Sequence, residues 1–106
     1  MAQVYFITTQ FSLAANGSTN ADILTKLQSQ KRIINRIFGD SQANVTVQVN
    51  ADQLQVMNMD SQHFPSNGEG LPLEIDLTNY SVVNAGITNN TGGAVTYNLT
   101  IQYTQG

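Results

Sequence analysis

The chain has 106 residues, of which 41% are hydrophobic and 10% are charged, and its formal net charge is −3 at pH 7. This length predicts one domain with a substantial core, and the negative charge argues against general nucleic-acid binding, which needs a positive field. The sequence contains no cysteine, which excludes disulfides, thiolate catalysis and zinc–thiolate sites within these residues. Asn, Gln and Thr make up 34 residues, so neutral polar groups supply most of the solubility.

The first ten residues lack the features of an export signal. They contain no basic residue and no apolar run of signal-peptide length, and no later segment approaches the ~20 apolar residues of a membrane span. We therefore expect a protein that is made in the cytoplasm and is not inserted in a membrane. Five Asn-x-Ser/Thr triplets are present, and we interpret them as a result of the high Asn and Thr content rather than as glycosylation sites.

Residues 3–14 predict the first strand because apolar residues recur with a period of two. The alternation places two sets of side chains on opposite faces: Tyr5, Ile7, Phe11 and Leu13 on one, Val4 and Phe6 on the other. Asn16-Gly17-Ser18 predicts a turn directly after this strand.

Residues 20–38 allow two interpretations. In a helix, Asn20 would be the N-cap and Gly39 the C′ residue. Against a helix, cationic and amide side chains interrupt its apolar side, and the second half of the segment is rich in β-branched residues. We favour a short strand or helical turn at 22–28 and a strand at 31–38 over one long helix.

The middle of the chain predicts two more strands. Residues 44–49 alternate cleanly, with the valines directed inward, and residues 53–57 form a strand in which Leu54 and Val56 are expected to be buried. Residues 62–71 form the longest connection without a pattern, and loops of this kind often carry binding residues.

The last third of the chain predicts strands at 73–77 and 80–88, and a turn at 89–93 is expected to pair the latter with a terminal strand at 95–103. Seven or eight short strands at regular spacing are typical of a sandwich. The sequence therefore predicts an all-β fold, a single-domain antiparallel β-sandwich of jelly-roll type over residues 1–106.

Catalytic and metal-binding patterns are absent from the sequence. His63 is the single histidine, so a catalytic triad or a two-histidine metal site within one subunit is excluded. We interpret it as an ordinary surface or turn histidine, and a metal site shared between subunits is the alternative. Glu74 and Asp76 share one face of their strand, and we interpret them as charges that protect a sheet edge rather than as a calcium site or a glycosidase pair. We expect no catalytic residue, no cofactor and no bound metal.

All four cations lie within residues 26–36. On a strand at 31–38, Arg32 and Arg36 would share a face and form a basic stripe. The stripe could dock on acidic positions of a neighbouring subunit, contact packaged nucleic acid, or pair with aspartates of the same chain. Arg32, Arg36, Glu74 and Asp76 are therefore the candidate subunit interface.

Four stretches carry a family resemblance: Phe11-Ser-Leu-Ala-Ala-Asn-Gly, then Ile23-Leu24, then Lys31-Arg-Ile-Ile-Asn-Arg-Ile-Phe with the alternating segment Gly39-Asp-Ser-Gln-Ala-Asn-Val-Thr-Val-Gln-Val, and last Ile87-Thr-Asn-Asn-Thr-Gly-Gly-Ala-Val-Thr-Tyr. Their order resembles the small β-sandwich and jelly-roll modules of bacteriophage virion proteins. The resemblance implies a structural subunit of a virus particle: a minor capsid, penton, decoration or spike-base protein. Such a subunit would form homo-oligomers, contact other virion proteins and reside in the virion without enzymatic activity.

A non-catalytic carbohydrate-binding sandwich is the alternative interpretation. Aromatic side chains would stack on a glycan, and amide groups would hydrogen-bond to it. The candidate platforms are Tyr5, Phe64, Tyr80, Tyr97 and Tyr103.

Overall fold

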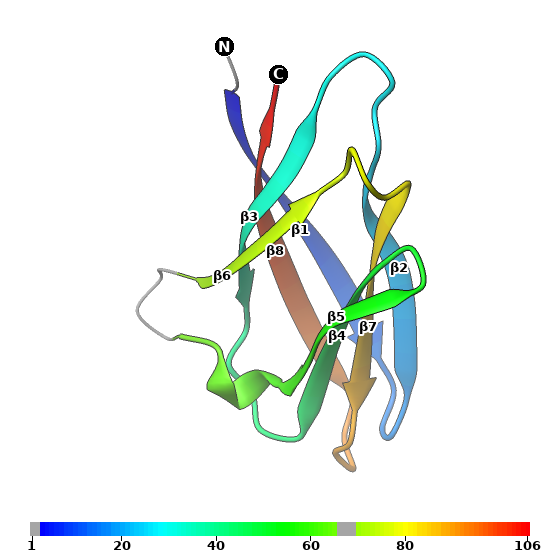
Figure 1. Cartoon of the computed structure of the whole chain (residues 1–106). Helices are drawn as coiled ribbons and strands as arrows, with labels where there is room; N and C mark the ends of the chain where they lie inside the picture. Colours follow the sequence, from blue (N-terminus) through cyan, green and yellow to red (C-terminus); the bar gives the residue numbers. More distant parts are fainter. Residues whose placement is uncertain (1–2, 66–69) are drawn as a thin grey trace.

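The computed structural model describes residues 3–65 and 70–106 and arranges them in two four-stranded antiparallel sheets (Figure 1). The strands of the first sheet, in spatial order, are β1 (Gln3–Leu13), β8 (Val95–Gln105), β3 (Arg32–Gly39) and β6 (Leu71–Asp76). Those of the second sheet are β2 (Ser18–Thr25), β7 (Val82–Asn89), β4 (Val45–Ala51) and β5 (Leu54–Asp60). A 3-10 turn, η1 (Ser61–His63), follows β5.

The strand orders β1-β8-β3-β6 and β2-β7-β4-β5 are those of an eight-stranded jelly roll. Apart from the β4–β5 hairpin, each connection between successive strands passes from one sheet to the other. The predicted all-β antiparallel sandwich of jelly-roll type is therefore confirmed.

The segment 20–38 lies largely in two strands, β2 and β3, which agrees with the favoured interpretation. The alternative of one long helix is wrong. Gly39, which suits a helix C-terminus, has a different role here: a Cβ atom at this position would lie 2.8 Å from the Phe64 ring. Close packing at the end of β3 therefore requires a residue without a side chain. No helix in the described ranges is long and apolar enough to cross a membrane.

The core lies between the sheets and follows the period-2 pattern of the strands. Alternate residues of the central strands are fully buried: Val45, Val47 and Val49 in β4, Val83, Ala85 and Ile87 in β7, and Tyr97, Leu99 and Ile101 in β8. Burial of such a side chain contributes about 1.5–3 kcal/mol, so these rows dominate the stability of the sandwich.

The predicted pairing of the strand at 80–88 with the terminal strand is wrong. β7 lies in the second sheet between β2 and β4, whereas β8 pairs with β1 and β3. The buried side chain of Asn89 fixes the segment where the chain crosses from β7 in the second sheet to β8 in the first. Its Nδ2 donates to the carbonyls of Ala14 at 3.0 Å and Gly93 at 2.8 Å, and its Oδ1 accepts from the Thr91 amide at 2.9 Å. These bonds replace the ladder that a hairpin would provide.

The expected burial of Leu54 is also wrong, because 55% of this residue is exposed, and Val56 is half-buried. The register of β5 against β4 shifts between Val49 and Asn50. Before the irregularity, Met59 and Met57 pair with Val47 and Val49 and take core-facing positions; beyond it, Leu54 pairs with Ala51 beside the β4–β5 turn.

Candidate assembly surface

The first half of β1 exposes four consecutive large apolar residues. Val4 is 54% exposed, Phe6 is 61% exposed, and Tyr5 and Ile7 are each 37% exposed. Leu54 is the only other large hydrophobic residue classed as exposed within the described ranges. The apolar surface is thus concentrated on one short piece of one strand.

The exposed half of β1 lies where the two sheets no longer face each other. Figure 1 shows the start of β1 beside the end of β8 at the end of the molecule that carries both termini, whereas the far end of β1 approaches β2. Phe11 and Leu13 in that far end are buried. On the inner face, coverage by the second sheet separates the two halves of the strand, whereas Val4 and Phe6 lie on the outer face.

On the inner face, aromatic stacking and an arginine partly close the open end of the sandwich. Tyr5 stacks on Tyr103, with ring centroids 5.5 Å apart and an interplanar angle of 24°. The Arg32 guanidinium lies 5.4 Å from the Tyr103 centroid, and its Nη1 donates to the Thr25 carbonyl at 2.7 Å. Its Nε donates to Gln105 Oε1 at 2.9 Å, so Arg32 is held within its own subunit.

The outer face of the β1–β8 pair is neutral and hydrogen-bonded across the strands. Thr8 Oγ1 lies 2.7 Å from Thr100 Oγ1, and the Phe6 ring contacts Phe38 with a centroid separation of 6.1 Å. Neither strand contains an Asp, Glu, Lys or Arg residue. The β1–β8 pair therefore adds no formal charge to the surface around Phe6.

The predicted basic stripe does not form, because Arg32 and Arg36 lie on opposite faces of β3. Ile34 pairs with Tyr103 but Arg36 pairs with Gln102, so a β-bulge shifts the register between them. Cross-strand partners share a face, and consecutive residues of β8 alternate, so Arg36 is directed to the outer face. A contact of Arg32 and Arg36 with acidic residues of another subunit stays a prediction, but one stripe cannot supply both arginines.

Glu74 and Asp76 lie on β6, an edge strand of the first sheet, as the interpretation of edge-protecting charges requires. Asp76 has partners in its own chain: its Oδ1 accepts from the Thr78 amide at 2.8 Å, and its Oδ2 lies 3.5 Å from Lys31 Nζ. The backbone and hydroxyl groups of Thr78, with a smaller contribution from Lys31, lower the pKa of Asp76.

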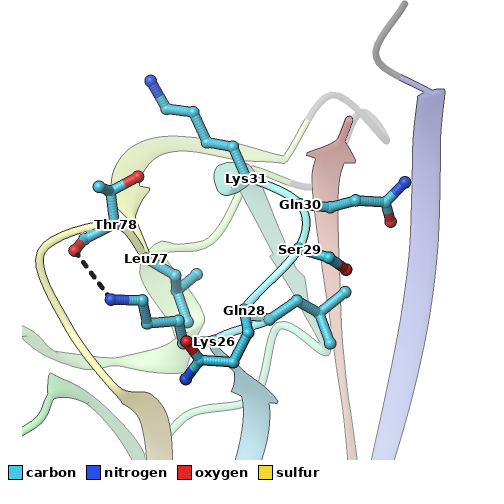
Figure 2. A pocket seen from close by; sticks show the side chains of 8 residues that line it. Lys26, Gln28, Ser29, Gln30, Lys31, Leu77 and Thr78 are labelled. Carbon is cyan, nitrogen blue, oxygen red and sulfur yellow. Dashed lines mark hydrogen bonds between the residues drawn. The ribbon is translucent and has the colours of Figure 1, made fainter.

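A shallow hollow of about 230 Å³ lies beside residues 26–31, next to Leu77 and Thr78 (Figure 2). Lys26 Nζ donates to the Thr78 carbonyl at 3.4 Å, whereas Figure 2 shows the Lys31 side chain turned away from the hollow. Its lining residues include no carboxylate and no histidine. Within the described residues, no cluster of His, Cys, Asp or Glu could hold a metal ion.

Most aromatic residues proposed as glycan platforms are inaccessible. Phe64, Tyr97 and Tyr103 are buried, and Tyr80 is half-buried. The Tyr97 hydroxyl makes no hydrogen bond of acceptable geometry among the described residues; burial raises the pKa of this phenol, and the nearby Ser61 hydroxyl opposes part of that effect. His63 is exposed at the end of η1, and the adjoining residues 66–69 of the predicted binding loop lie outside the described residues.

No family model matches the chain, and no curated protein matches it. Among solved structures, it is similar to a protein of Bacillus endospore appendages, described as a novel family of disulfide-linked pili: identity is 13%, 97% of this chain and 86% of that chain are covered, and the TM-score is 0.51. This similarity shows the fold alone.

Two further structures have TM-scores too low to support an inference. The infectious bursal disease virus VP2 subviral particle gives a TM-score of 0.38 at 14% identity and covers 98% of this chain and 32% of that chain. The Drosophila NLP core gives a TM-score of 0.32 at 17% identity, and the match covers 91% of this chain and 97% of that chain.

Proposed function

We propose that this chain is a non-catalytic structural subunit of a virus particle, acting as a minor capsid, penton, decoration or spike-base protein. Its role is to contact copies of itself and other virion proteins. The observation that carries the proposal is the charge-free β1–β8 surface with its exposed apolar run, Val4 to Ile7. Contiguous exposed apolar residues on a folded domain mark a contact surface.

The surface chemistry favours a protein partner over a nucleic acid. Phosphate contacts need lysines and arginines, and neither β1 nor β8 contains any. Arg32 is engaged with Thr25 and Gln105 of its own chain. We assign no catalytic role to the hollow near Lys26, because its lining offers no carboxylate or histidine for proton transfer.

The fold supports an assembly role by analogy alone. The endospore appendage protein shares the fold and belongs to disulfide-linked pili. This chain has no cysteine, so its own contacts would be non-covalent. Large neutral sheet faces, rich in Thr, Asn and Gln, suit such contacts, since they hydrogen-bond without strong salt dependence.

The mass of the purified chain in solution tests the assembly role directly. We expect light scattering and electron microscopy to show a discrete oligomer or a regular particle that forms as concentration increases. A monomer at all concentrations up to about 1 mM, where even weak specific contacts are populated, would exclude self-assembly. A monomer that binds an immobilised glycan would instead support the carbohydrate-binding alternative.

The virion location needs a separate measurement. Mass spectrometry of virus particles purified from the host that carries this gene should detect the chain at a fixed ratio to the major capsid protein. An assembling chain that is absent from such particles would remove the virion part of the proposal and leave the structural role.

A further inference from the structure

The described chain has four edge strands, and β1 is the one without protection against pairing. β6 contains Pro72, Glu74 and Asp76, β2 contains Asp22 beside a bulge, and β5 ends at Asp60 and has an irregular register. Charges, proline and bulges are the devices that keep sheet edges from pairing with other chains. β1 is eleven residues long, uncharged and regular in register.

The backbone groups that face the open edge of β1 can be identified from the neighbouring ladder. Gly106 N donates to the Lys31 carbonyl at 3.0 Å and Asp40 N to the Asn98 carbonyl at 3.3 Å, so even-numbered residues of β8 bond toward β3. The odd-numbered ones therefore bond toward β1, whose odd residues are their partners. The even residues of β1 thus direct their N–H and C=O groups to the open edge; they are Val4, Phe6, Thr8, Gln10 and Ser12.

We propose that two copies of the chain pair through β1, antiparallel and about a two-fold axis at Phe6, to join their β1–β8–β3–β6 sheets into one. This inference rests on the proposed self-assembly and specifies its contact. The register pairs Val4 with Thr8 of the second copy and Phe6 with its own equivalent through backbone hydrogen bonds. Tyr5 then lies opposite Ile7 of the second copy on the inner face, as an aromatic and β-branched pair.

Two features of the surface favour a second copy as the partner. A two-fold contact brings identical surfaces together, and on a molecule of net charge −3 this requires a patch without charge, which β1 and β8 provide. The same register brings all four exposed apolar residues, Val4 to Ile7, into cross-strand contact in both copies. A partner rich in charge would find no complementary group here.

The contact is small, which defines the concentration range of the test. The four side chains offer roughly 400 Å² per copy, about half of a standard-size interface. The backbone ladder adds to it, but the isolated pair should dissociate readily at low concentration. Such a contact is suited to repetition within an assembly.

Phe6→Lys tests the contact, because it places two like charges at the axis. Phe6 is exposed, so the variant should keep the far-UV spectrum and unfolding midpoint of the parent fold, and its self-association should weaken more than about tenfold in sedimentation experiments. Leu54→Lys is the matched control: Leu54 is similarly exposed on β5, and its replacement should leave association unchanged. Val4→Lys should act as Phe6→Lys does.

Cysteine cross-linking tests the register, since the chain has no cysteine of its own. A mixture of Val4→Cys and Thr8→Cys chains should form a disulfide-linked heterodimer, because a hydrogen-bonded pair has its Cα atoms about 5.5 Å apart. Either variant alone should not cross-link, because identical positions are then roughly 14 Å apart along the strands.

The outcomes separate this inference from the proposed function. An assembly that forms equally well with Phe6→Lys overturns the β1 contact and leaves the structural role intact. An assembly that Phe6→Lys abolishes but that gives no Val4–Thr8 cross-link overturns the two-fold register. A chain that never associates overturns the proposed function and the inference together.

Discussion

The two halves of β1 have the same kind of sequence and the same partner strand, but different surroundings. From Gln3 to Leu13 the strand pairs continuously with β8, and apolar residues recur on both halves. On the inner face, Phe11 is 3% exposed whereas Ile7 is 37% exposed, and on the outer face Phe6 is 61% exposed. The difference shows that alternation determines which face a side chain occupies, while the position of the second sheet determines whether that face is covered.

The largest effect is expected where coverage is complete. Val47→Asp and Leu99→Asp each place an unpaired carboxylate between the sheets, at a cost of several kcal/mol against a typical total stability of about 5–15 kcal/mol. We expect neither variant to fold cooperatively, as judged by far-UV circular dichroism and soluble expression. Phe6→Asp, on the uncovered half of β1, should fold normally. Soluble and cooperative Val47→Asp or Leu99→Asp proteins would show that these residues are not in the core.

A direct comparison within β1 should give the next largest effect. Phe11→Ala should lower the free energy of unfolding by about 3–5 kcal/mol, since it removes a buried ring and leaves a cavity. Phe6→Ala should change it by no more than about 1 kcal/mol, because the side chain is exposed and its ring contact is with Phe38 alone among the described aromatic pairs. Urea unfolding at low protein concentration measures both values. Equal losses would mean that the outer face at Phe6 is covered in solution.

The strands and their faces could be predicted because each is a local property of the sequence. The valines of β4 alternate with polar residues, and every one of them is buried as expected. The pairing of strands could not be predicted in the same way. A turn at Asn89 to Gly93 is compatible with a hairpin, but the buried amide of Asn89 bonds to Ala14, far away in the sequence, and the chain crosses to the other sheet.

The candidate interface depended on a feature that sequence periodicity does not reveal. A β-bulge inserts one residue without changing composition, and it reverses the face of every side chain after it. The bulge between Ile34 and Arg36 moved Arg36 away from Arg32 in this way. The apolar residues Val4 to Ile7 can be seen in the sequence, but their exposure depends on which face and which part of β1 the second sheet covers, and only the tertiary structure defines that.

A smaller effect is expected for two tyrosines, of which Tyr97 is buried in the core and Tyr5 is exposed on the first half of β1. Tyr97→Phe should raise the free energy of unfolding by about 1 kcal/mol, because it removes a buried hydroxyl that has no partner in the described part of the chain. Tyr5→Phe should be nearly neutral, since the Tyr5 hydroxyl is exposed and donates only to Gln3 Oε1 at 2.7 Å. Urea midpoints of the two variants test the difference. A destabilised Tyr97→Phe protein would show that the hydroxyl is hydrogen-bonded in solution.

The Tyr97→Phe variant also has a distinct pH dependence. Burial raises the pKa of Tyr97, so the unfolded chain releases this proton at lower pH than the folded protein does. The contribution of the neutral phenol to stability is complete below the unfolded pKa of about 10 and decreases as the pH rises above it. Tyr97→Phe should therefore lose less stability than the parent between pH 9 and 11, as measured by urea midpoints at each pH.

The smallest effect concerns the opposite edge of the same sheet, where β6 has charges in place of the apolar run of β1. The Thr78 amide and hydroxyl and Lys31 lower the pKa of Asp76, so the folded protein binds this proton less readily than the unfolded chain. The resulting stabilisation is present above the unfolded pKa of about 3.9 and is lost as the pH falls through the lowered folded value. Asp76→Asn should remove this part of the acid dependence, and its urea midpoint should change less than that of the parent between pH 5 and 2.

Glu74→Gln is the matched control: Glu74 is exposed on the same face of β6, and its replacement leaves the bonds from Thr78 and Lys31 to Asp76 in place. Identical acid profiles for the parent and Asp76→Asn would show that the bonds at Asp76 do not persist in solution, and that this edge is protected by the charge itself rather than by a fixed arrangement around it.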